Sequence, residues 1–236
     1  MNKFVIFASA RSGSTSLARV LGESADVKMA IEPFHPGFSK WNNGEKDYSK
    51  LIIDAKTMND ALDEIFTKYT AMKVLNYQFE EELYLEMLKR LDIKVVFLKR
   101  NNTAQQVLSN LVAEQTGEYH KQENQEIYNN LKKVDINKME EMINYLDSMN
   151  DTYGKFLKEN RAGGYIALNY EALYSDNFSK NKETITNICN FLEVSLPSDE
   201  AIKKYMTPEE AKINFENIYK KVPNYLEIEN RFGKLY

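Results

Sequence analysis

The sequence predicts an α/β fold in which helices flank a parallel β-sheet. Two short apolar runs, residues 4–8 and 93–98, are bounded by polar residues, as is typical of strands covered on both faces. Strand, helix and strand alternate within a few dozen residues, which favours parallel pairing with right-handed crossovers. Only 9 glycines and 5 prolines occur in 236 residues, and this scarcity favours helices over a turn-rich all-β fold.

The remaining elements follow from short apolar runs and from apolar residues at helical spacing. The predicted strands are residues 4–8, 70–75, 93–98 and 163–170, and residues 27–31 form a short strand-like piece. The predicted helices are residues 14–23, 57–69, 79–91, 137–160 and 180–193, with another beginning at about Thr103. The helix at 79–91 is expected to turn Leu83, Leu85, Met87, Leu88 and Leu91 mostly inward. Cys189 lies among apolar residues of the last helix and is expected in the core.

The length suits a single domain over residues 1–236. We expect an α/β core at 1–193 and a helical tail at 194–236, broken at Pro208 and Pro223. Residues 37–56, with Trp41, are irregular and polar, and form either a lid over a bound acceptor or a surface excursion.

Composition excludes several classes of partner. The net charge is −4, so no overall basic field indicates nucleic-acid binding. A single cysteine excludes an internal disulfide and fits a reducing compartment. No run approaches the roughly 20 apolar residues of a membrane-spanning helix, and the N-terminus does not resemble a signal peptide. We therefore expect a cytoplasmic protein without a membrane span; the oligomeric state stays open.

The turn after the first strand is predicted to bind an oxyanion. A strand at 4–8 leads through small residues into a helix, and Ser12, Ser14 or Thr15 is available as its N-cap. The first N–H groups of a helix lack internal partners, and the helix dipole favours negative charge there. Arg11 adds a guanidinium to these hydroxyls. The turn therefore suits a phosphate or a sulfate.

The same turn differs from a Walker A loop, which reads G-x-x-x-x-G-K-[ST]. When the two are aligned on Gly13, Ala8 replaces the first glycine and Ser14 replaces the lysine. That lysine normally reaches the β- and γ-phosphates. The pattern therefore disfavours a magnesium-dependent kinase or NTPase.

The segment Ala10-Arg-Ser-Gly-Ser-Thr15 resembles the 5′-phosphosulfate loop of sulfotransferases that use 3′-phosphoadenosine 5′-phosphosulfate (PAPS). It is most similar to the bacterial carbohydrate and glycolipid branch. The resemblance implies a P-loop-NTPase-like three-layer sandwich with a helical C-terminal extension, and a cofactor product that is adenosine 3′,5′-bisphosphate (PAP), without a metal. The phosphosulfate ligands that it implies are Arg11, Ser12, Gly13, Ser14, Thr15 and Ser16.

A second segment, residues 95–109, resembles the part of these enzymes that holds the 3′-phosphate. There an arginine follows a strand and a serine lies on the next helix, the places of Arg100 and Ser109 here. If strands 4–8 and 93–98 are neighbours, Arg11 and Arg100 converge on a ligand with two phosphate-like groups. Two lesser similarities are a lysine-bearing strand at 72–76 and a strand-to-helix corner at 168–173. The resemblance covers most of residues 3–192 and fits the tail only loosely.

Sulfuryl transfer requires positioned reactants, charge stabilisation and an acceptor for the proton of the attacking group. Arg11 is expected to act electrostatically, because a guanidinium does not readily give up a proton. Glu32 occupies the place of the proposed base of the bacterial branch, and His35 on the same loop is the second candidate. The alternative for Glu32 is a carboxylate that only pairs with Arg11 or Lys73.

These features favour a sulfotransferase that acts on a hydroxyl or amine of a small-molecule or carbohydrate acceptor. Two other hypotheses stay open: a P-loop nucleotide or sugar kinase, and a non-catalytic nucleotide-binding protein. Against the kinase, the strand at 93–98 ends in Lys99-Arg100, whereas a magnesium site needs an acidic residue there.

Overall fold

The core of the molecule is a five-stranded sheet in which all strands are parallel, and the α/β prediction is confirmed. The computed structural model describes residues 2–37, 46–119, 125–207 and 218–235. The strands are β1 (Lys3–Ala8), β2 (Met29–Ile31), β3 (Ala71–Leu75), β4 (Ile93–Lys99) and β5 (Tyr165–Asn169). Their order across the sheet is β2-β3-β1-β4-β5, so β1 is hydrogen-bonded to β3 on one side and β4 on the other.

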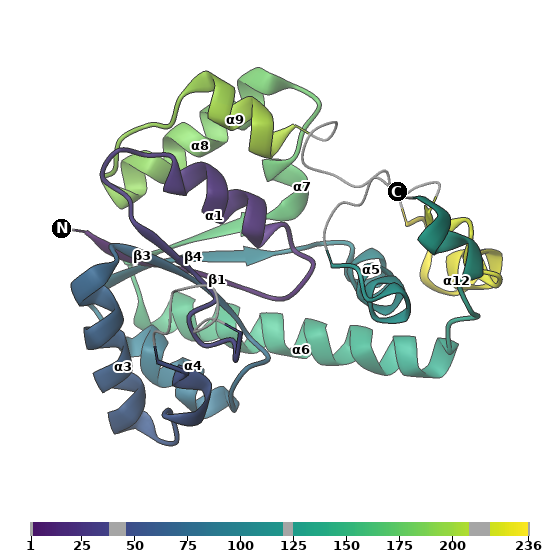
Figure 1. Cartoon of the computed structure of the whole chain (residues 1–236), viewed down its shortest axis with the longest axis horizontal. Helices are drawn as coiled ribbons and strands as arrows, with labels where there is room; N and C mark the ends of the chain where they lie inside the picture. Colours follow the sequence, from purple (N-terminus) through teal and green to yellow (C-terminus); the bar gives the residue numbers. More distant parts are fainter. Residues whose placement is uncertain (1, 38–45, 120–124, 208–217, 236) are drawn as a thin grey trace.

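Two layers of helices enclose the sheet (Figure 1). One layer comprises α3 (Ala55–Lys68), α4 (Glu81–Lys89) and α6 (Ile136–Asn160); the other comprises α1 (Ser14–Gly22), α8 (Phe178–Leu192) and α9 (Asp199–Met206). Successive strand side chains point to opposite faces. Val5 and Phe7 therefore join the core under α3, α4 and α6, whereas Phe4 and Ile6 join the core under α1, α8 and α9.

A third apolar cluster lies beyond the end of the sheet, at the right of Figure 1. It joins α5 (Thr103–Thr116), the 3₁₀ helix η2 (Gln125–Asn130), the N-terminal half of α6 and α12 (Tyr225–Phe232). Within the predicted tail, α9 instead packs on α1 and α8. Pro223 lies in the turn before α12, as predicted, while the predicted break at Pro208 falls outside the described residues.

The predicted boundaries lie within two residues of the observed ones, and two of the differences have clear causes. Leu91 was expected to face inward but is 82% exposed, because α4 ends at Lys89 and the chain turns away before β4. The helix expected at residue 57 begins at Ala55. Asp54 is its N-cap and forms a capping box with Thr57, whose backbone N–H donates to the Asp54 carboxylate at 2.7 Å.

Cys189 is a buried free thiol within the core, as predicted, and burial raises its pKa to about 11.

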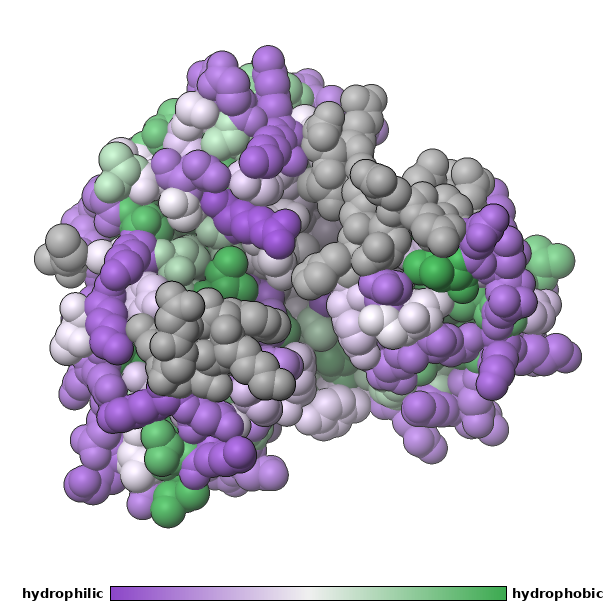
Figure 2. Space-filling view, in the orientation of Figure 1, coloured by the Kyte–Doolittle hydropathy of each residue, from purple (hydrophilic) through white to green (hydrophobic). Residues whose placement is uncertain are grey.

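In the ranges that the structure describes, no helix has the length and apolar character needed to cross a membrane. The surface in view is mainly hydrophilic, with apolar residues scattered over it (Figure 2).

Arg161 is a buried guanidinium that joins three elements at the amino end of the sheet. It follows α6 and donates to the carbonyl oxygens of Leu88 (3.2 Å), Arg90, Ile93 and Gly164 (3.4 Å). Two of these carbonyls lie at the end of α4, where helix carbonyls lack internal partners. The Arg90 and Gly164 carbonyls also accept backbone N–H groups, from Ile93 and Val95, so Arg161 adds a second hydrogen bond to each and joins the end of α4 to the residues that begin β4 and precede β5.

We expect Arg161→Met to lower the free energy of unfolding by about 2–4 kcal/mol, because it removes several hydrogen bonds to carbonyls between α4, β4 and β5. Urea denaturation followed by circular dichroism would measure the loss. Arg231→Met is the matched control: this exposed arginine pairs with Glu140 at the surface, and its removal should cost under about 1 kcal/mol. Equal losses in the two variants would contradict the role assigned to Arg161.

Candidate functional site

The loop at Ser9–Gly13 joins β1 to α1 at the carboxyl ends of β1, β3 and β4. The Ser12 hydroxyl donates to the Ser9 carbonyl at 2.7 Å, within the loop itself. A hydroxyl N-cap was predicted for α1, and this was wrong: Gly13 is the N-cap, with φ of 81° and no side-chain capping bond. The hydroxyls of Ser14 and Thr15, in the first turn of α1, therefore do not cap it. The Ser16 backbone N–H donates to the Gly13 carbonyl at 3.1 Å.

Two tyrosines that follow β5 explain the glycine at position 13. The short helix α7 (Tyr170–Leu173) follows β5 and brings Tyr170 and Tyr174 against the loop. The Tyr174 phenol donates to the Gly13 carbonyl at 2.6 Å. A Cβ atom at position 13 would lie 2.6 Å from a ring carbon of Tyr174 and 2.9 Å from one of Tyr170. Both the positive φ and this contact therefore require glycine.

The two sequence-predicted halves of the anion site meet in the structure. Arg11 lies on the loop, with a positive φ of 61°, and its Nε donates to the Ser109 hydroxyl on α5 at 3.0 Å. Arg100, directly after β4, donates from Nη1 to the Arg11 carbonyl at 3.2 Å. Burial lowers the pKa of Arg11, and the neighbouring Arg100 charge acts in the same direction. Arg11, Arg100 and Ser109 thus form one cluster, as expected from adjacent strands β1 and β4.

Arg100 is a buried cation without a carboxylate partner. It is 5% exposed, donates from Nη2 to the Gln105 amide oxygen and stacks on the Tyr170 ring, with Cζ 4.2 Å from the ring centroid. Its Nε has no hydrogen-bond partner. Within the described residues, no acidic side chain forms an ion pair with it. Burying a charge without a counter-ion is costly, so this environment is suited to an anionic ligand.

Lys73 is a further cation of the site that the sequence prediction did not include among the site residues. It lies on β3, is 1% exposed, and its Nζ donates to the Thr15 hydroxyl at 2.9 Å. The same Nζ forms an ion pair with the Glu32 carboxylate. Lys73 therefore connects the first turn of α1 to the predicted base. The signal in the sequence was a single lysine within an otherwise apolar strand, which a neighbouring functional group must stabilise.

Glu32 directly follows β2 and is held by its backbone. Its N–H donates to the Lys73 carbonyl at 2.9 Å, and its φ is 54°. In the described part of the chain, only Arg11, Glu32 and Glu193 are non-glycine residues with positive φ. Two of these three are predicted site residues, and such backbone conformations cluster at functional sites. Of the two partners foreseen for the Glu32 carboxylate, the structure shows Lys73.

The charges around Lys73 act on its pKa in both directions. Burial lowers the pKa of Lys73, while the Glu32 carboxylate opposes this shift, and the guanidinium charges of Arg19 and Arg11 add to it. The Glu32–Lys73 pair thus places a carboxylate and an ammonium group in contact beside Thr15.

His35 lies on the same loop as Glu32 but has a competing contact. The side-chain Nδ1 accepts a hydrogen bond from the Gly37 N–H at 3.0 Å. The backbone N–H of His35 donates to the Glu32 carbonyl at 2.9 Å. In the neutral ring the hydrogen then resides on Nε2. Accepting a proton at Nδ1 would break the contact with Gly37. Trp41, the other feature of the predicted lid, lies outside the described residues.

Other candidate sites in the structure do not coincide with this cluster. A cavity of about 510 Å³ lies between α5 and α12, and it is lined by Asn101, Asn102, Thr103, Ala104, Ile143, Asp147, Glu171, Phe232 and Lys234. Neither the loop nor Glu32 lines this cavity. The candidate functional site is therefore the cluster of charged groups. Over the described ranges, no group of three histidine, cysteine or acidic residues is arranged to hold a metal ion.

Comparison with known proteins identifies the fold. The sequence matches no protein-family model and no curated protein. A sulfotransferase from Alicyclobacillus acidocaldarius superposes with a TM-score of 0.51 at 16% identity, covering 99% of this chain and 96% of that one. The sulfotransferase domain from the curacin biosynthetic pathway gives 0.50 at 14% identity, with 98% and 97% covered. Mouse sulfotransferase SULT7A1, solved with PAP, gives 0.49 at 13% identity, with 100% and 83% covered.

The class that these neighbours define is the sulfotransferase type of P-loop-like α/β fold. The five-stranded parallel sheet and its two helical layers match that fold over nearly the whole chain. At identities of 14–16% the similarity concerns the fold.

We expect Gly13→Ala to destabilise the protein more than Gly117→Ala. Both glycines have positive φ, 81° and 73°, but a Cβ atom at Gly117 meets nothing within 4 Å. Gly117→Ala should therefore cost about 1 kcal/mol from backbone strain alone. Gly13→Ala should cost roughly 1–3 kcal/mol more, because the two tyrosine rings must move. Thermal denaturation would compare them, and equal losses would contradict the close packing of Tyr174 on the loop.

Proposed function

We propose that this chain is a PAPS-dependent sulfotransferase that moves a sulfuryl group to a hydroxyl or amine of an acceptor. The observation that carries the proposal is Arg100, which is buried, has no carboxylate partner among the described residues, and lies in one cluster with Arg11 and Ser109. The Arg11 and Arg100 guanidinium groups follow β1 and β4, meet at one edge of the sheet and suit an anionic ligand. The sulfotransferase fold supports this reading.

In this proposal the loop and α1 hold the 5′-phosphosulfate. The candidate donors are the backbone N–H groups of the loop, the Ser14, Thr15 and Ser16 hydroxyls and the Arg11 guanidinium. The Ser12 hydroxyl already donates to the Ser9 carbonyl, so Ser12 contributes through its backbone N–H. Lys73 reaches the same turn through Thr15, so an ammonium from β3 takes the place of the absent Walker A lysine. Arg100 and Ser109 bind the 3′-phosphate, and Nε of Arg100 is the donor that gains a partner.

PAPS supplies an activated sulfuryl group whose bond to the 5′-phosphate oxygen breaks as the acceptor oxygen or nitrogen attacks. Glu32 accepts the proton that the attacking group loses. Arg11 and Lys73 stabilise the negative charge on the departing phosphate, at positions set before reaction begins. Phe34 and Pro33 next to Glu32 are buried and limit water around the carboxylate.

Glu32 is a better candidate for the base than His35. The carboxylate contacts Lys73, which contacts Thr15 of the loop, whereas the His35 Nδ1 is engaged with Gly37. For the acceptor, the loop sequence favours a carbohydrate or a glycolipid, and this part of the proposal is tested separately.

Calorimetry with PAP and with ATP–Mg²⁺ tests the proposed donor. We expect PAP to bind more tightly, and we expect Arg100→Ala to weaken PAP binding by about 30-fold or more, since a buried charge pair is lost. Adenosine 5′-monophosphate, which lacks the 3′-phosphate, should lose far less. Lys99→Ala, the neighbouring cation on β4, is the matched control and should change neither affinity strongly.

Two results would contradict the proposal. Tighter binding of ATP–Mg²⁺ than of PAP would favour a nucleotide or sugar kinase. Equal losses of PAP and of the monophosphate in Arg100→Ala would show that Arg100 does not hold the 3′-phosphate.

We expect Glu32→Gln to lower kcat by about 10²- to 10⁴-fold, the range for loss of a general base, with PAP still bound. The same change removes the carboxylate that raises the pKa of Lys73, so that pKa falls further. PAP affinity depends on the charged ammonium and is lost as the pH rises through the Lys73 pKa. This loss should therefore begin at a lower pH in Glu32→Gln than in the wild type, as calorimetry across a pH series would show. Unchanged turnover in Glu32→Gln would exclude Glu32 as the base.

A further inference from the structure

Two exposed tyrosines flank the proposed catalytic pair. Tyr77 is 55% exposed and Tyr119 is 49% exposed. Tyr77 lies two residues after β3, the strand that carries Lys73, and Tyr119 follows α5, the helix that carries Ser109. Tyr119 is tied to the loop, because its carbonyl accepts a hydrogen bond from Arg11 Nη1 at 2.6 Å.

Tyr77 is exposed although the turn around it is held firmly. The Asn76 N–H donates to the Ala8 carbonyl at 3.1 Å, and the Asn76 side chain donates to the Ser9 hydroxyl at 2.9 Å. After Tyr77, the N–H groups of Gln78 and Phe79 donate to the buried Tyr84 phenol at 2.7 and 3.0 Å. The Tyr77 ring is therefore presented to solvent from an ordered turn.

The position of the Tyr77 phenol relative to the site is also visible in its ionisation. Partial burial contributes most to raising the pKa of Tyr77 to about 12, and the nearby Glu32 carboxylate and Tyr119 phenol add to the shift. Tyr77 follows β3, whose Lys73 carbonyl accepts the Glu32 N–H, and its neighbour Asn76 binds the end of β1. Tyr119 binds Arg11 of the loop through its carbonyl. Both tyrosines therefore lie at the edge of the sheet that carries the proposed site.

We propose that Tyr77 and Tyr119 form the acceptor site and bind a ring that carries the group to be sulfated, either a sugar or a phenol. This inference rests on the proposed sulfotransferase function. A half-exposed aromatic ring gains apolar contact when another ring stacks on it, and its phenol can still hydrogen-bond to the ligand or to water. Because the turn at Tyr77 is already ordered, little conformational entropy is lost on binding.

The test uses the full chain and first measures PAP affinity by calorimetry. Sulfate transfer from radiolabelled PAPS is then measured to methyl β-glucoside, to 4-nitrophenol and to glycerol, an acyclic alcohol. We expect one of the two ring compounds to be the better acceptor, and the comparison between them distinguishes a sugar site from a phenol site. Glycerol should be the poorest acceptor.

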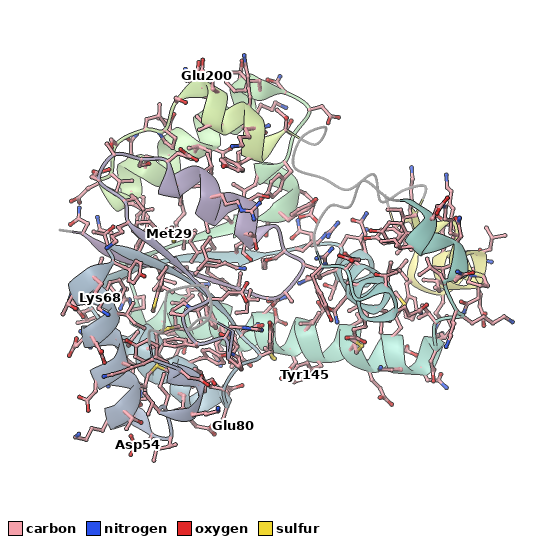
Figure 3. The ribbon with its side chains drawn as sticks, in the orientation of Figure 1. Met29, Asp54, Lys68, Glu80, Tyr145 and Glu200 are labelled. Carbon is pink, nitrogen blue, oxygen red and sulfur yellow. The ribbon has the colours of Figure 1, made fainter. Side chains whose placement is uncertain are left out.

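Variants then assign the effect to the tyrosines. Tyr77→Ala and Tyr119→Ala should each raise KM for the ring acceptor by roughly 3- to 10-fold, with PAP affinity unchanged. Tyr77→Phe keeps the ring and should stay near the wild-type KM. Tyr145→Ala removes a comparably exposed tyrosine on α6, labelled in Figure 3, and should leave KM unchanged.

The outcomes separate the two proposals. A wild-type chain that does not bind PAP overturns the proposed function and this inference with it. If PAP binds, the acceptor site is overturned by transfer to glycerol as efficient as to the rings, by no transfer to either ring, or by unchanged KM in both alanine variants.

Discussion

The hydrogen bonding of β1 between β3 and β4 is the constraint on which the site depends. Ala8, at the end of β1, is paired with Leu75 on one side and with Leu98 on the other. All three strands run in the same direction, so their carboxyl ends open at one edge of the sheet. The loop after β1 therefore begins between the two neighbouring strand ends. Lys73 approaches it from β3 and Arg100 approaches it from β4, and neither position requires a long or flexible connection.

This arrangement concentrates positive charge where the protein cannot easily neutralise it. Lys73 has Glu32 as a partner, whereas Arg100 is stabilised by the carbonyl of Arg11, the amide of Gln105 and the face of Tyr170. The N-terminus of α1 adds a partial positive charge to the same region. Departures from ordinary stabilising patterns are expected at functional sites. Arg161, at the opposite end of the sheet, is the contrasting case, because its buried guanidinium is surrounded by carbonyl acceptors of the protein itself.

The sequence was informative wherever a local pattern determines the structure. Apolar runs predicted four of the five strands and a strand-like piece at the position of β2, and the order of the elements predicted parallel pairing. The meeting of Arg11 with Arg100 followed from the adjacency of β1 and β4. Contacts that depend on packing between distant segments were less predictable. The hydroxyl N-cap was wrong because Tyr174, some 160 residues away, approaches so closely that glycine must occupy that position. Leu91 was misplaced because helical spacing does not show where a helix ends. Lys73 joined the site only through the sheet register that puts it beside Thr15.

The supply of an ammonium group from β3 has a consequence for how such proteins diverge. In a Walker A loop, the residue that contributes the charge and the residues that shape the backbone are consecutive, so a change in one disturbs the other. Here they are encoded about 60 residues apart, as Lys73 and Thr15 are. Insertions or replacements in the loop can then accumulate while the electrostatic field at α1 is retained. A sequence motif made of consecutive positions does not include the residue that produces this field. A protein of this kind is therefore more easily recognised by its fold than by its sequence.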